Sequence, residues 1–189
     1  MKLNKQVVFT ILLLTLVAAL YRIMPGRPFG FAPQIAMAVF AGAIFKNKKW
    51  AFAIPVISML LSDVFYQVLY MNGLSEMQGF YDGQWQNYLL FALLVLVGFA
   101  IKKINLRNVF LASLIAPTVY FLLSNFLVWV SYGPTAGYNR PKTFSGLMMC
   151  YVDGIPFYKW SIVATLVFSA IFFGTYYLVN RKKQTLATA

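Results

Sequence analysis

The chain has no histidine, one cysteine and only four acidic residues among its 189 residues. Histidine is the commonest general base and metal ligand, so its absence excludes the usual sites built around that side chain. The lone Cys150 excludes an intramolecular disulfide and any metal site made of several cysteines. No phosphate-binding loop or H-E-x-x-H motif occurs either. We therefore predict that the protein is not an enzyme and holds no cofactor.

Apolar side chains dominate the composition. Hydrophobic residues make up 61% and charged residues 11%, against about one half and one quarter in soluble proteins. These values are typical of an integral membrane protein, here a single domain over residues 1–189. The formal net charge is +12, but the basic residues stand at the ends of apolar segments and not along one polar face. We therefore expect a lipid bilayer and not a nucleic acid as partner.

Six apolar segments divide the chain and predict an all-α fold, a bundle of six transmembrane helices. The second and fourth segments are short for a hydrocarbon core of about 30 Å. The first also resembles a signal peptide because Lys2 and Lys5 precede it, but no A-x-A site follows, so we expect it to remain as a helix. The six predicted spans are residues 7–24, 31–45, 50–70, 85–101, 109–130 and 157–179.

Basic residues are distributed unequally between the two ends of these segments. One side holds eleven of them with no acidic residue, whereas the other holds five beside three acidic residues. Because cytoplasmic loops carry the excess of lysine and arginine, we predict cytoplasmic termini and a location in a bacterial plasma membrane. The eleven residues are Lys2, Lys5, Lys46, Lys48, Lys49, Lys102, Lys103, Arg107, Arg181, Lys182 and Lys183.

A sixteen-residue pattern occurs twice, each time within a long apolar segment. Residues 55–70 and 117–132 share six identical positions, including a leading proline and the sequence Leu-Leu-Ser. The next position is Asp63 in the first copy and Asn125 in the second. Paired, proline-interrupted segments with polar groups at membrane depth are typical of transport and binding sites. Chance similarity within a restricted apolar alphabet is the alternative.

Polar side chains gather in the predicted outer half of the bundle. In the third segment Ser58, Ser62 and Tyr66 recur every four residues beside Asp63, so they share one helical face. Such a face must meet protein or water, whereas the inner halves are nearly all apolar. We therefore predict a polar cavity that opens to the outside. Its predicted substrate-binding residues are Arg22, Gln34, Asp63, Tyr66, Asn125 and Trp129.

A segment rich in glycine, proline and tyrosine, residues 131–156, predicts a long outer loop that acts as a lid. It contains Met148, Met149 and Cys150, whose soft sulfur atoms suit copper(I) or haem iron. Cys150 is therefore a weak metal candidate, and a redox protein centred on this run is one alternative. We favour the other, in which the run is an apolar plug packed on the bundle.

A purely structural role is an alternative for several of these residues. Asp63 would pair with Arg22 and lock the first and third helices together, which does not exclude a cavity. Tyr88, near the outer end of the fourth segment, is typical of an interface anchor. Small residues such as Gly42 would let helices approach closely.

Six helices in 189 residues, with both ends inside and long outer loops, resemble the substrate-binding S-components of energy-coupling-factor vitamin transporters. The topological resemblance covers the whole chain, and the motifs cover about a quarter of it. The motifs similar to the small, solitary cobalamin-transporter type, and to related uncharacterised bacterial membrane proteins, are Arg22-(x2)-Pro25, Phe31-Ala32-Pro33 and Leu61-Ser62-Asp63. The resemblance implies capture of a vitamin or corrinoid-like solute from outside. It also implies release with the help of a separate energy-coupling membrane and ATPase module.

Besides an enzyme or redox protein centred on Met148, Met149 and Cys150, two functional hypotheses follow from the sequence. The first is a membrane uptake protein that binds a small solute in an outward-facing polar cavity. The second is a non-transporting scaffold or partner protein whose intramembrane polar residues serve helix packing. A void beside Asp63 and Asn125 favours uptake, whereas closed packing around them favours the scaffold.

Overall fold

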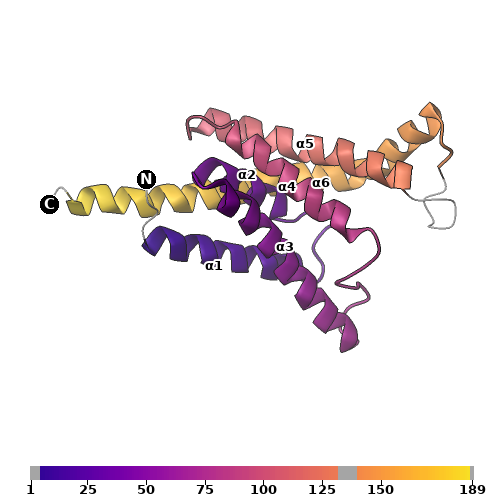
Figure 1. Ribbon diagram of the computed structural model, residues 1–189, viewed down its shortest axis with the longest axis horizontal. Helices are drawn as coiled ribbons and strands as arrows, with labels where there is room; N and C mark the ends of the chain where they lie inside the picture. Colours follow the sequence, from indigo (N-terminus) through magenta and orange to yellow (C-terminus); the bar gives the residue numbers. More distant parts are fainter. Residues whose placement is uncertain (1–4, 132–139, 188–189) are drawn as a thin grey trace.

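The computed structural model describes residues 5–131 and 140–187, with side chains described as far as residue 180 (Figure 1). Every regular element in these ranges is a helix, which confirms the all-helical prediction for this part of the chain. The helices are α1 (Lys5–Arg22), α2 (Gln34–Ile44), α3 (Lys48–Met71), α4 (Gln84–Phe99), α5 (Leu106–Ser131) and α6 (Phe144–Ala187).

Four helices, α1, α3, α5 and α6, are long and apolar enough to cross a membrane. The other two are shorter, with 11 residues in α2 and 16 in α4. At 1.5 Å per residue these lengths are about 16 and 24 Å. The four long apolar helices indicate a helical membrane protein.

The connecting segments fall into two groups at opposite ends of the molecule. α1 begins and α6 ends at the same side, on the left in Figure 1, and we term this side the terminal end. It also holds the turns 45–47 and 100–105, whereas segments 23–33 and 72–83 lie at the opposite side, the loop end. None of the four acidic residues of the chain occurs at the terminal end. They are Asp63, Glu76, Asp82 and Asp153.

α2 lies at the centre of the bundle and contacts each of the other five helices. Ten of its eleven residues are buried, so an almost continuous apolar sequence is what this position requires. Phe40 packs on α6, where its ring centroid lies 5.8 Å from that of Phe172 and 5.1 Å from that of Phe173.

Two glycines set the distance between α2 and α4. A Cβ atom added to Gly42 would overlap the carbonyl oxygen of Val95, and one added to Gly98 would overlap that of Val39. The two backbones therefore meet with no side chain between them, as in other small-residue helix contacts. This confirms that Gly42 permits close helix approach.

The repeated pattern places its two prolines alike but its polar residues differently. Pro55 lies inside α3 and Pro117 inside α5, and both are fully buried. α3 packs on α1, α2 and α4, whereas α5 packs on α2, α4 and α6. α3 and α5 do not contact each other. The two copies therefore face different neighbours.

α6 begins much earlier than the sequence indicates. Its first residue is Phe144, whereas the predicted span begins at Phe157. The predicted loop is therefore wrong for residues 144–156, and residues 132–139 lie outside the described part of the chain. The Gly146 N–H donates to Thr143 Oγ1 at 3.2 Å, which caps the first turn.

Contacts with α5 explain why this stretch is helical despite its glycines and proline. The Tyr151 hydroxyl donates to the Leu122 carbonyl oxygen at 3.2 Å, and Tyr158 stacks on Phe121 with ring centroids 4.5 Å apart. Gly154 lies directly against the side chain of Asn125, where a Cβ atom would leave no room. Composition alone does not reveal these tertiary contacts.

We expect Gly98→Ala to lower the free energy of unfolding by about 1–3 kcal/mol, because the added methyl group must push α2 and α4 apart. Thermal unfolding in detergent measures the loss. The matched control is Gly174→Ala in α6, because nothing lies within 4 Å of a Cβ atom there. Equal stability of the two variants would contradict the close backbone contact.

Candidate functional site

An ion pair between Arg22 and Asp63 lies at the centre of the candidate site. Arg22 is the last residue of α1, and its Nη1 pairs with Asp63 Oδ1 on α3. The same Nη1 donates to Ser62 Oγ at 2.6 Å. Asp63 is only 1% exposed, so its charge needs partners within the protein. The structure thus contains the predicted lock between the first and third helices.

The second oxygen of Asp63 is bound by α4. Gln84 Nε2 and the Tyr88 hydroxyl each donate to Asp63 Oδ2 at 2.6 Å. The prediction of Tyr88 as a plain interface anchor is therefore wrong, because its hydroxyl reaches inward. Gln84 is not among the predicted site residues, although the spacing of four residues places it and Tyr88 on one face of α4. The carboxylate of Asp63 joins three helices.

Tyr66 connects the ion pair to the segment between α1 and α2. Its hydroxyl donates to the Arg22 carbonyl oxygen at 2.7 Å and accepts from Arg27 Nη2 at 3.1 Å. Arg27 Nε donates to the same carbonyl oxygen at 2.6 Å. The Arg22 guanidinium carbon lies 5.6 Å from the centroid of the Tyr66 ring, a cation–π contact.

The segment between α3 and α4 closes over Asp63. The side-chain oxygen of Gln67 accepts from the backbone N–H groups of Gly79 and Phe80, at 3.1 and 3.3 Å. A Cβ atom at Gly79 would overlap the carbonyl oxygen of Asp63, so only glycine lets the segment come this close. The carboxylate is covered by protein and lines none of the described cavities.

Gln34, the first residue of α2, is buried against α1 one turn before Arg22. Its Nε2 lies 3.4 Å from the Ala18 carbonyl oxygen, and its Oε1 has no partner among the described residues. Ser58, which shares the face of α3 with Ser62, donates to the Thr15 carbonyl oxygen at 3.4 Å. The polar face of α3 therefore meets α1, as the rule for buried polar groups requires.

Asn125 and Trp129 belong to a different part of the molecule. The Asn125 side-chain amide donates to the Phe121 carbonyl oxygen at 2.8 Å. The backbone carbonyl oxygen of Asn125 accepts from Cys150 Sγ on α6 at 3.4 Å. Trp129 Nε1 donates to the Pro141 carbonyl oxygen at 2.9 Å. Since α3 and α5 do not touch, these two residues do not join the cluster around Asp63. Their role in substrate binding stays a prediction.

Cys150 packs at the same interface between α5 and α6. It is 5% exposed, whereas Met148 and Met149 are 39% and 44% exposed. Among the described residues, no three His, Cys, Asp or Glu side chains lie close enough together to hold a metal ion. The metal role of Cys150 has no supporting geometry in this part of the chain.

A cavity of about 280 Å³ opens at the loop end, beside the Arg22–Asp63 cluster. Residues 23–27 and Phe29 form one wall, Tyr66 and Leu69 of α3 another, and residues 74, 75 and 77 the third. Of the six predicted site residues only Tyr66 lines it. Arg27, which is not among the predicted site residues, lines it too. We term this cavity the loop-end pocket.

The fold and this cluster define a helical membrane protein with a closed ionic centre beneath a small pocket. The chain belongs to the family described as a family of unknown function (DUF6580), which it matches over residues 2–186. No curated protein and no solved structure matches it.

We expect Asp63→Asn to cost about 3–5 kcal/mol of unfolding free energy, because it leaves the Arg22 guanidinium without its counter-charge inside the bundle. Asp153→Asn is the matched control. Asp153 pairs with Arg140 at 2.7 Å but is 51% exposed, so that loss should stay below about 1 kcal/mol. Chemical unfolding in detergent compares the two. Similar losses would contradict the structural importance of the buried pair.

Proposed function

We propose that the protein is a membrane uptake protein that captures a small solute from outside at the loop-end pocket. The observation that carries the proposal is the position of Arg27 between this pocket and the closed ion pair. Three of its five N–H groups are used, for Arg22, Phe31 and Tyr66, and this leaves two without a partner among the described residues. A guanidinium at a pocket wall is suited to a carboxylate or phosphate.

The walls of the pocket favour an amphipathic solute. Apolar side chains of Met24, Phe29, Leu69 and Met77 surround the polar groups of Arg27 and Tyr66. Ligand sites commonly combine a mostly apolar lining with a few placed polar groups. The volume of about 280 Å³ lies at the small end of the usual range, which favours a vitamin-sized solute over a whole corrinoid.

The distribution of charge supports an outward orientation of this pocket. The turns at the terminal end and the first residues of α3 hold Lys46, Lys48, Lys49, Lys102 and Lys103, with no acidic residue. By the rule that basic residues stay inside, the terminal end is cytoplasmic and the loop end faces outward. We propose six spans in this orientation, in a bacterial plasma membrane, with α2 and α4 as the two short members and α2 enclosed by the other helices.

The proposed uptake needs an energy source outside this chain. The sequence has no phosphate-binding loop, so ATP hydrolysis falls to a separate membrane and ATPase module, as in the S-component systems that the sequence resembles. The tightly bonded centre suits movement of the bundle as one body, because Asp63 ties three helices together.

A scaffold role is the second candidate, favoured by one observation. Arg22 and Asp63 satisfy each other, and Asp63 lines none of the described cavities, as expected of polar groups that serve only helix packing. Under this hypothesis the loop-end pocket binds nothing.

Binding to purified protein distinguishes the two candidates. We expect a carboxylate-bearing solute from a panel of nicotinate, pantothenate and biotin to raise the unfolding temperature. The uncharged relative nicotinamide controls for the carboxylate. Arg27→Gln should weaken binding at least tenfold, because it removes a charge-assisted bond. Arg140→Gln, which alters an arginine away from the pocket, should leave affinity unchanged. No binding by any compound, or equal binding by Arg27→Gln, would favour the scaffold.

Orientation has its own test. In a Cys150→Ala background we expect Gln78→Cys, at the loop end, to react with a membrane-impermeant maleimide in intact cells. Lys103→Cys, at the terminal end, should react only after the membrane is opened. Both positions are exposed in the structure, so access depends on the side of the membrane. The reverse pattern would contradict the proposed orientation.

A further inference from the structure

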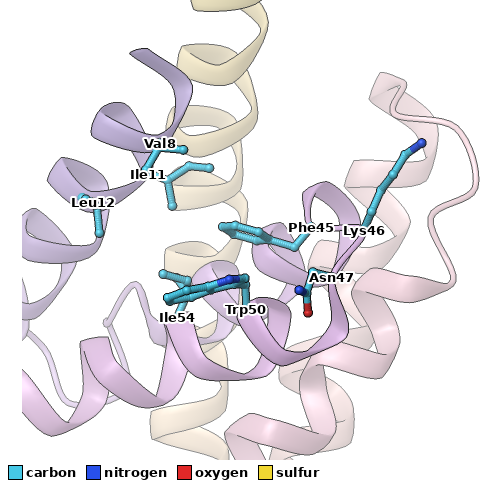
Figure 2. Close-up of a pocket in the computed structure, with 8 residues that line it drawn as sticks. All are labelled: Val8, Ile11, Leu12, Phe45, Lys46, Asn47, Trp50 and Ile54. Carbon is cyan, nitrogen blue, oxygen red and sulfur yellow. The ribbon is translucent and has the colours of Figure 1, made fainter. Parts of the chain in front are cut away.

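A second cavity, larger than the loop-end pocket, lies at the terminal end between α1 and α3. Its volume is about 470 Å³, and its lining comes from α1, the turn 45–47 and the first turns of α3 (Figure 2). Ile11 and Ile54 form its floor and are 2% and 3% exposed. Leu12 and Trp50 stand at its edges and are 54% and 55% exposed. The cavity is therefore a groove with a buried floor that opens sideways.

The lining of this groove is almost wholly apolar. Figure 2 shows the rings of Phe45 and Trp50 beside Ile54, with Val8, Ile11 and Leu12 facing them from α1. In a membrane protein, a groove that opens sideways near a helix end faces hydrocarbon. A tryptophan at a helix end is also typical of the level where lipid headgroups begin. The shape and lining fit an acyl chain.

Lys46 lines the groove, and three other lysines lie close in sequence to residues that line it. The Lys46 side chain points away from the apolar side chains of the groove, as Figure 2 shows. Lys48 and Lys49 follow at the start of α3, and Lys5 lies one turn before Val8 on α1. None of these four ammonium groups makes an ion pair or side-chain hydrogen bond with another described residue, and no acidic residue occurs at this end. Each basic residue near the membrane surface strengthens attraction to anionic lipid.

We propose that this groove binds one anionic phospholipid. One acyl chain lies along Ile11 and Ile54, and the phosphate lies among Lys46, Lys48 and Lys49. Charge complementarity favours an anionic lipid over a neutral one, because an apolar groove beside these three lysines matches a lipid with a negatively charged headgroup. The site is separate from the loop-end pocket, and the proposal does not depend on solute uptake.

Native mass spectrometry of the full-length protein in nonionic detergent tests the proposal. The probes are phosphatidylglycerol and phosphatidylcholine with identical acyl chains, so that only the headgroup charge differs. We expect one phosphatidylglycerol per chain at lipid concentrations that give little phosphatidylcholine binding. The triple variant Lys46→Gln, Lys48→Gln, Lys49→Gln should lose about a hundredfold in affinity for phosphatidylglycerol, and much less for phosphatidylcholine. Equal binding of the two lipids to the natural chain would overturn the proposal.

Two neighbouring leucines of α1 give a matched test of the groove itself. Leu12→Trp places an indole in the groove and should reduce lipid binding at least tenfold. Leu13→Trp adds the same bulk at a position that is 49% exposed but does not line the groove, so it should leave binding unchanged. Both sites are exposed, so both variants should fold, and unfolding temperatures verify this. The same lipid binding by both variants would exclude the groove as the site and leave it to another occupant, such as a partner helix.

Discussion

The carboxylate of Asp63 is the group on which the loop end of this protein depends. A negative charge on a helix within a membrane requires a counter-charge and hydrogen-bond donors, because neither water nor lipid supplies them there. Arg22 provides the charge from α1, and Gln84 and Tyr88 provide donors from α4. The Gln84 amide also donates to the Gly79 carbonyl oxygen at 2.8 Å, and Gly79 packs against the backbone of Asp63. One side chain on α3 therefore links two other helices to it.

The two arginines of the loop end, Arg22 and Arg27, have different roles because the ionic centre is closed. The side chain of Arg22 is directed to Ser62 and Asp63, and its carbonyl oxygen accepts bonds from Tyr66 and Arg27. Arg27 is thus held by the cluster while it faces the loop-end pocket. The ion pair maintains the shape of the pocket, and the polar contact with a solute falls to Arg27 in the proposed function.

The sequence predicted helices well and their neighbours poorly. The polar face of α3 and the Arg22–Asp63 pair follow from helical spacing and the cost of unpaired charge, two local rules. The separation of Asn125 from Asp63 does not follow from these rules. A repeated sequence pattern determines which residues share a helical face, but not which helix that face contacts. The early start of α6 at Phe144 was missed for a similar reason. Gly154 and Pro156 resemble loop residues in the sequence, and the contact of Gly154 with Asn125 on α5 becomes visible only in the structure.

The shortness of α2 has a consequence for how the protein enters its membrane. An isolated helix of 11 residues, about 16 Å long, leaves polar chain ends within the hydrocarbon layer and is a poor candidate for independent insertion. α2 is also enclosed by all five other helices, including α6 from the far end of the chain. Its final environment therefore exists only after synthesis is nearly complete. In the six-span arrangement that we propose, biogenesis must couple the insertion of α2 to late tertiary folding, and not follow a strict helix-by-helix order.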